Sequence, residues 1–125
     1  MYNKLGGEVV INQIVDDFYQ IMSTDPLAKE CFQTHSGKDM AETAKKLKYF
    51  LSGWLGGPPL YMQTYGHPRL RMRHFPFSIG ELESKQWLYC MRKSLEKNNV
   101  QANDQAKLME AFENVTKMIK NRSED

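Results

Sequence analysis

The sequence has few cysteines, little net charge and no long apolar run, and each of these absences excludes a class of protein. The two cysteines, Cys31 and Cys90, form neither a CxxC pair nor a disulfide framework, so we expect reduced thiols and a cytoplasmic protein. A formal net charge of +2 does not by itself indicate a nucleic-acid or membrane partner. The apolar runs are too short to span a membrane, and the N-terminal residues lack the apolar centre of a signal peptide.

What the chain does contain is a dense basic segment at residues 66–77, with the sequence GHPRLRMRHFPF. This segment holds two of the three histidines, His67 and His74, and it is bounded by Pro68 and Pro76. Because proline limits helices, any helix inside the segment can be little longer than one turn. Three arginines alternate along it, namely Arg69, Arg71 and Arg73.

Elsewhere the apolar residues recur at helical spacing, and no segment shows the period-two alternation of a core strand. Asp39 is expected to cap one of the helices, and the run Gly56-Gly57-Pro58-Pro59 is expected to end it. The sequence therefore predicts an all-α fold with four main helices in one domain, residues 1–125, with a polar tail at about 121–125. The main helices are expected at about 8–22, 40–54, 79–97 and 104–119, with a short helix at about 26–32 and irregular chain at 57–65. Leu82 is expected to begin the apolar face of the third main helix.

The residue types leave several chemistries open. A single neutral imidazole can bind haem iron without a CxxCH attachment motif, and the alternating arginines suit the propionate carboxylates of haem. The same arginines would suit phosphates of a nucleic acid, or they could be plain surface charge. Tyr19 follows the core position Phe18 on the first helix, so its hydroxyl either enters a cavity or reaches water.

Four motifs together resemble the truncated haemoglobins, specifically the second group of that family. They are Phe18-Tyr19, LSGWLGGPPLY at 51–61, GHPRLRMRHFPF at 66–77, and WLYCM at 87–91. The resemblance covers about residues 6–121. It implies a truncated globin fold, a two-over-two helical sandwich around haem, with a very short helix before the proximal histidine.

The resemblance also implies roles for individual residues. His74 would bind the haem iron, and Tyr19 and Trp87 would donate hydrogen bonds to the bound ligand. Leu47 would cover the distal face, and the small Thr43 would leave a route to the iron. Lys46 and Arg73 would contact the haem propionates, with Tyr61 and His67 as helpers. Further lining residues would be Phe50, Trp54, Leu70, Phe77 and Ile79.

One region departs from the family pattern, because the loop before Asp39 is longer than in many members. Either Phe32 or His35 would occupy the distal position there, and the spacing from Pro26 slightly favours His35. With His35, the pocket would have three polar groups on the distal side, and with Phe32 it would have two.

The resemblance implies non-covalent haem b at a five-coordinate iron, which binds O₂ and related diatomic ligands such as NO and CO. Two or three hydrogen-bond donors favour slow oxygen release, which suits high-affinity binding, transport or scavenging, and leaves NO- or peroxide-detoxifying chemistry open. Any turnover would need an external electron donor or reductase. We expect a monomer or weak homodimer without nucleic-acid or membrane partners. The alternative is a helical anion- or nucleic-acid-binding module that uses Arg69, Arg71 and Arg73.

Overall fold

A computed structural model describes residues 1–33, 39–66 and 81–119. The described chain is helical throughout, with turns and short connections but no strand. The helices are α1 (Tyr2–Leu5), α2 (Gly7–Thr24), the 3₁₀ helix η1 (Pro26–Ala28), α3 (Lys29–Gln33), α4 (Met40–Trp54), α5 (Leu60–Tyr65), α7 (Glu81–Lys97) and α8 (Ala102–Ile119). The prediction of four main helices is confirmed by α2, α4, α7 and α8.

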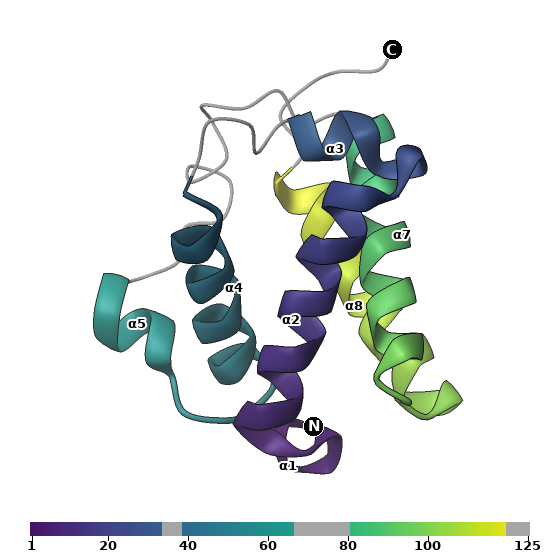
Figure 1. The fold of residues 1–125 in the computed structure, drawn as a ribbon. Coiled ribbons are helices and arrows are strands. Elements are labelled where there is room, and N and C mark those ends of the chain that lie inside the picture. Colours follow the sequence, from purple (N-terminus) through teal and green to yellow (C-terminus); the bar gives the residue numbers. More distant parts are fainter. Residues whose placement is uncertain (34–38, 67–80, 120–125) are drawn as a thin grey trace.

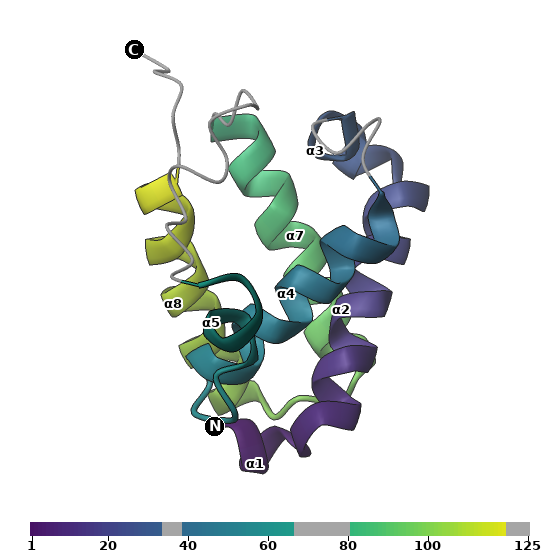
Figure 2. The same ribbon diagram turned by 90° about the vertical axis from the view of Figure 1, so that its left-hand side faces the viewer.

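The four long helices form two pairs. Helix α2 packs against α4 and also against α7, and α7 packs against α8. Figures 1 and 2 show α2 and α4 crossing on one side of the molecule and α7 and α8 on the other. The short helices η1 and α3 pack on α7, while α5 packs on α4. In the described part of the chain, no helix is long and apolar enough to cross a membrane.

Local capping explains where two of the helices begin. The side chain of Asp39 accepts hydrogen bonds from the backbone N–H groups of Ala41 at 3.0 Å and Glu42 at 3.3 Å, which satisfies two donors that α4 would otherwise leave unpaired. Asp25 accepts from the N–H of Leu27 at 2.9 Å, ahead of Pro26 in the first turn of η1. The Asp39 cap was predicted from the sequence.

Two expectations were wrong. Residues 60–65 form helix α5 rather than irregular chain. Leu82 is 47% exposed and does not belong to the core face of α7. The very short helix expected before His74 lies outside the described residues.

The Gly56-Gly57-Pro58-Pro59 run folds back on the end of α4. The hydroxyl of Ser52 donates to the carbonyl of Pro58 at 2.7 Å, and the N–H of Gly57 donates to the carbonyl of Ser52 at 2.8 Å. The Tyr2 ring packs so closely on Gly57 that a Cβ there would lie 2.4 Å from it. Tyr2 also donates its backbone N–H to the carbonyl of Leu55 at 2.8 Å. The loop therefore joins α1 to the end of α4.

The core lies where α2 meets α4 and α7. Phe18 and Val15 of α2 and Met91 of α7 are fully buried. The Ser94 hydroxyl of α7 donates to the Ile14 carbonyl of α2, so these two helices are joined by a buried hydrogen bond as well as by apolar contacts. Asp16 and Lys48 form an ion pair at 2.9 Å between α2 and α4.

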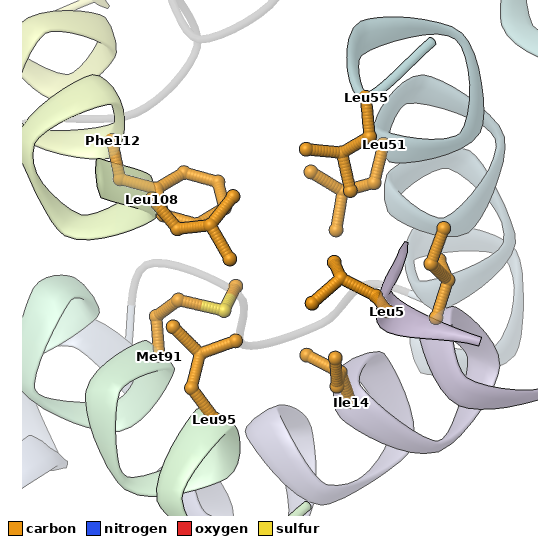
Figure 3. A pocket seen from close by; sticks show the side chains of 9 residues that line it. Leu5, Ile14, Leu51, Leu55, Met91, Leu95, Leu108 and Phe112 are labelled. Carbon is orange, nitrogen blue, oxygen red and sulfur yellow. The ribbon is translucent and has the colours of Figure 1, made fainter. Parts of the chain in front are cut away.

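A small apolar cavity of about 10 Å³ remains in this core. Figure 3 shows side chains from α1, α2, α4, α7 and α8 pointing into it. The lining residues are Leu5, Ile11, Ile14, Leu51, Leu55, Met91, Leu95, Leu108 and Phe112. Because the lining has no polar group to bind water, the cavity is expected to be dry.

Candidate functional site

One face of α4 carries the row of residues assigned to the cofactor. Thr43, Leu47, Phe50 and Trp54 follow one another at spacings of four, three and four positions, so they share a helix face. All four are only half-buried, whereas the neighbouring Leu51 is 2% exposed. Leu51 thus belongs to the buried apolar core. The row beside it consists mainly of large apolar side chains that keep part of their surface exposed.

Thr43 has a defined orientation at the start of this row. Its hydroxyl donates a hydrogen bond to the carbonyl of Asp39 at 3.0 Å. Since that bond uses its only O–H, Thr43 has no second proton to donate to a ligand. The expected role of Thr43 as a small residue beside the ligand route stays a prediction.

Tyr19 of α2 and Trp87 of α7 both pack against the ring of the buried Phe18. The ring centroids of Phe18 and Tyr19 are 4.9 Å apart, and those of Phe18 and Trp87 are 5.0 Å apart, with edge-to-face geometry in both pairs. Two side chains that can donate hydrogen bonds are therefore held by one shared core residue, although 68 positions separate them in the sequence (87 minus 19).

The environment of Tyr19 keeps its hydroxyl protonated. Burial raises the pKa of Tyr19 well above its ordinary value, and the nearby Cys31 thiol adds to this effect. A neutral phenol is the form that can donate a proton in a hydrogen bond. Of the two interpretations of Tyr19, the structure favours a hydroxyl surrounded by protein over one in open water.

Gln86 of α7 holds helix α3 in place through two hydrogen bonds. The side-chain oxygen of Gln86 accepts from the backbone N–H of Cys31 at 2.7 Å, and its amide nitrogen donates to a carboxylate oxygen of Glu30 at 2.7 Å. Phe32, on the same short helix, is half-buried and packs against the core. The hydrogen bond to Gln86 lowers the pKa of Glu30, which is an exposed carboxylate.

Tyr61 and Lys46 occupy the other end of the site. Tyr61 of α5 is 9% exposed, and its ring lies edge-on to Phe50 of α4 at a centroid distance of 6.4 Å. Lys46 is exposed, with its ammonium nitrogen 5.5 Å from the ring centroid of Tyr65. The predicted contact of Lys46 with a haem propionate stays a prediction.

Aromatic rings connect the two ends of the site in an unbroken series. The Trp87 and Phe112 centroids are 5.4 Å apart, those of Phe112 and Trp54 are 4.9 Å apart, and those of Trp54 and Phe50 are 6.1 Å apart. Beyond Phe50 come Tyr61 at 6.4 Å and then Tyr65, 4.9 Å from Tyr61. We call this series, Trp87–Phe112–Trp54–Phe50–Tyr61–Tyr65, the ring chain.

Sequence reasoning missed three residues of this arrangement. Phe112, Gln86 and Tyr65 were given no role in the site. Helical spacing places Phe112 on an inward face of the last helix, but no local pattern shows that it joins Trp54 to Trp87.

Several predicted site residues lie outside the described residues, and their assignments stay predictions. They are His35, His67, Leu70, Arg73, His74, Phe77 and Ile79, together with Arg69 and Arg71 of the alternative anion-binding patch. In the part of the chain that the structure describes, no group of three or more His, Cys, Asp or Glu side chains is placed to hold a metal ion.

The described residues fit a flat apolar cofactor with a polar ligand beside it. Leu47, Phe50 and Trp54 offer a half-buried apolar face, and Tyr19 supplies a protonated hydroxyl within a densely packed region. A haem presents both an apolar macrocycle and a ligand-binding centre, so this combination of side chains matches it.

Comparisons with known proteins agree with this picture. The chain matches the family model described as bacterial-like globin over residues 1–121. It is 44% identical over 90 residues to the group 2 truncated haemoglobin YjbI of Bacillus subtilis, a match that covers 72% of this chain and 65% of that protein. The chain thus spans less than two thirds of the length of this relative.

Two solved structures are similar over almost the whole chain. A cold-adapted truncated haemoglobin from the Antarctic marine bacterium Pseudoalteromonas haloplanktis TAC125 has a TM-score of 0.92 and 37% identity, covering 98% of both chains. A truncated oxygen-avid haemoglobin from Bacillus subtilis has a TM-score of 0.83 and 37% identity, covering 96% of this chain and 98% of that one.

The fold is therefore that of a truncated, two-over-two globin. The chain belongs to the bacterial-like globin family, and within it to the group II truncated haemoglobins. Membership of this family implies that the chain binds haem.

Proposed function

We propose that this chain binds haem b non-covalently, with His74 as the iron ligand, and that Tyr19 and Trp87 hold O₂ or a related diatomic ligand in the pocket. The observation that carries the proposal is that both donor rings pack against Phe18, with centroids 4.9 and 5.0 Å from it. Because both rings contact the same residue, the two donors belong to one region of the molecule, where both would reach a single small ligand.

The bound haem would supply the iron centre that binds the diatomic ligand. The side chains of this protein would then determine how long the ligand stays. The Tyr19 O–H and the Trp87 indole N–H would donate to a ligand that carries partial negative charge, because such preorganised donors cost no reorganisation when the charge appears. Each bond would contribute on the order of 1–3 kcal/mol in a dry pocket, which corresponds to slow release and high affinity.

The remaining residues would hold the cofactor. Leu47, Phe50 and Trp54 would cover its apolar face, and Lys46 would attract a propionate at the rim. From outside the described residues, Arg73 would bind a propionate with His67 as a helper, while Leu70, Phe77 and Ile79 would line the pocket. Either Phe32 or His35 would complete the distal side. The similar haemoglobin from Bacillus subtilis is described as oxygen-avid, and high oxygen affinity is proposed for this chain on that ground too.

Haem titration of the purified chain tests the proposal. We expect stoichiometric uptake with a Soret band, and we expect His74→Ala to lose the histidine-ligated ferrous spectrum and to regain it with added imidazole. His67→Ala is the matched control, because it removes a histidine from the same segment and should keep the histidine-ligated spectrum. A wild-type chain that takes up no haem, or a His74→Ala variant with an unchanged spectrum, would contradict the proposal.

A further inference from the structure

The ring chain begins at Trp87 in the proposed ligand pocket and ends at the half-buried Tyr65 on α5. Between these two residues it passes Trp54 and Phe50, which would cover the haem. The Tyr65 hydroxyl donates a hydrogen bond to a carboxylate oxygen of Glu42 at 2.8 Å. A tyrosine at the end of a series of rings, with a base already bound to its proton, has the parts needed for one-electron oxidation.

We propose that the ring chain carries electrons from Tyr65 to the haem pocket, so that Tyr65 becomes the protein's radical site when the pocket reduces a peroxide. This inference rests on the proposed haem function and adds to it a route for electrons and a terminal residue. It concerns the side chains of this protein and not the chemistry at the iron.

The spacing of the oxidisable rings supports the route. Electron tunnelling through protein falls steeply with distance, so a series of short steps carries charge further than one long step. Trp87 and Trp54 are linked through Phe112, with centroid distances of 5.4 and 4.9 Å. Trp54 and Tyr61 are linked through Phe50, with distances of 6.1 and 6.4 Å. The two phenylalanines are not oxidised themselves and serve as packed bridges.

The last step joins two tyrosines directly. The Tyr61 and Tyr65 ring centroids are 4.9 Å apart. Tyr61 is 9% exposed, so a radical there would be shielded from water. Tyr65 is half-buried and is therefore the residue of this pair that an external reductant reaches more easily.

The hydrogen bond to Glu42 determines where the proton goes. The bond raises the pKa of Tyr65 to about 12, with burial as a lesser cause, so the tyrosine is a neutral phenol before oxidation. Loss of an electron makes a phenol strongly acidic, and the carboxylate 2.8 Å away is placed to accept the proton. The product is a neutral tyrosyl radical beside a protonated Glu42.

A nearby lysine favours this proton transfer. The ammonium nitrogen of Lys46 is 5.5 Å from the Tyr65 ring centroid. A positively charged Tyr65 ring would be repelled by this cation. Once the proton is on Glu42, the ring carries no net charge and the repulsion is absent.

Reduction of one peroxide, from ROOH to ROH and water, takes two electrons and two protons and breaks the O–O bond. Each passage along the ring chain supplies one electron, while the phenolic proton of Tyr65 stays on Glu42 and the pocket's protons come from water. An external one-electron reductant, of the ascorbate or phenol class, then returns an electron to Tyr65, and Glu42 returns the proton. Two such passages complete the reaction.

Tyr89 provides a matched control. Its hydroxyl donates to a carboxylate oxygen of Asp25 at 2.6 Å, and the Lys93 ammonium lies 5.6 Å from its ring centroid. Tyr89 therefore has a carboxylate acceptor and a neighbouring lysine, as Tyr65 does. The difference is that Tyr89 belongs to none of the contacts that make up the ring chain.

The test is freeze-quench electron paramagnetic resonance of the haem-loaded protein mixed with hydrogen peroxide. We expect a tyrosyl signal that is lost in Tyr65→Phe and retained in Tyr89→Phe. Glu42→Gln should lose most of the signal as well, because an amide can accept a hydrogen bond but not the proton. Trapping with a nitroso compound, followed by peptide mass spectrometry, should place the adduct on Tyr65.

A second measurement follows the haem itself. Without Tyr65, oxidising equivalents stay in the pocket, so peroxide should bleach the Soret band faster in Tyr65→Phe than in wild type or Tyr89→Phe. A protein that shows a Soret band but keeps its tyrosyl signal in Tyr65→Phe, or loses it in Tyr89→Phe, would overturn the ring-chain proposal and leave haem binding intact. A chain that takes up no haem would overturn both proposals.

Discussion

The side-chain oxygen of Gln86 accepts a hydrogen bond from the backbone N–H of Cys31 at 2.7 Å, and this bond joins α7 to α3. Both residues are buried, at 8% and 2% exposure. A glutamine on the long helix thus fixes a short helix of five residues, which is too short to be stable by itself. The position of Phe32, on the same short helix, therefore depends on this bond.

We expect Gln86→Ala to destabilise the protein by about 1–3 kcal/mol, because it leaves the buried Cys31 N–H without its partner. Urea unfolding of wild type and variant measures the difference. Gln63→Ala, at an exposed position of α5, is the control and should change the unfolding free energy little. Equal stability of Gln86→Ala and wild type would show that the bond contributes nothing.

Removing either distal donor should speed oxygen release. Trp87→Phe and Tyr19→Phe keep a ring beside Phe18 and remove only the N–H or O–H group. With about 1–3 kcal/mol for each bond, the dissociation rate should rise by about 5- to 150-fold in each variant. Stopped-flow displacement of O₂ gives the rates, and Tyr89→Phe serves as the control. Rates equal to wild type in both variants would contradict the assignment of these donors.

Gly57→Ala should destabilise the loop after α4. The added Cβ would lie 2.4 Å from the Tyr2 ring, and overpacking of this kind costs about 1–3 kcal/mol. If the ring is the cause, the cost should shrink when Gly57→Ala is made in a Tyr2→Ala background, because contacting residues are not additive. Thermal unfolding of the four proteins measures this coupling, and a cost unchanged by Tyr2→Ala would exclude the steric explanation.

The buried hydroxyl of Tyr19 should make stability depend on alkaline pH. Burial raises the pKa of Tyr19 in the folded state, whereas the unfolded chain has a value of about 10. The contribution of this group is therefore complete below about pH 10 and is lost above it, as the unfolded state releases the proton first. Urea midpoints measured from pH 8 to 11 should fall less steeply in Tyr19→Phe than in wild type. Parallel curves would contradict the prediction.

The helices that were predicted correctly are those whose signals are local. Asp39 caps α4 through its own side chain, two and three residues away, so sequence reasoning could place the start of α4. Helix α5 was missed because it is only six residues long and follows two prolines. It is stabilised by contacts such as that of Tyr61 with Phe50, which no short window of sequence contains.

The same distinction applies to the site. The row on α4 follows from helical spacing, but the position of Tyr19 beside Trp87 depends on Phe18, Phe112 and the packing of three helices. Leu82 shows the opposite error, because its spacing indicated a core position whereas its side chain is 47% exposed. The role of His74 rests on the family resemblance alone.

The dry cavity between the long helices gives the molecule a mechanical property. A folded state that encloses space too small and too apolar for water occupies more volume than its unfolded chain, which water surrounds completely. Hydrostatic pressure would therefore act on this part of the core, and a larger residue in place of one of its lining side chains would make the protein less compressible.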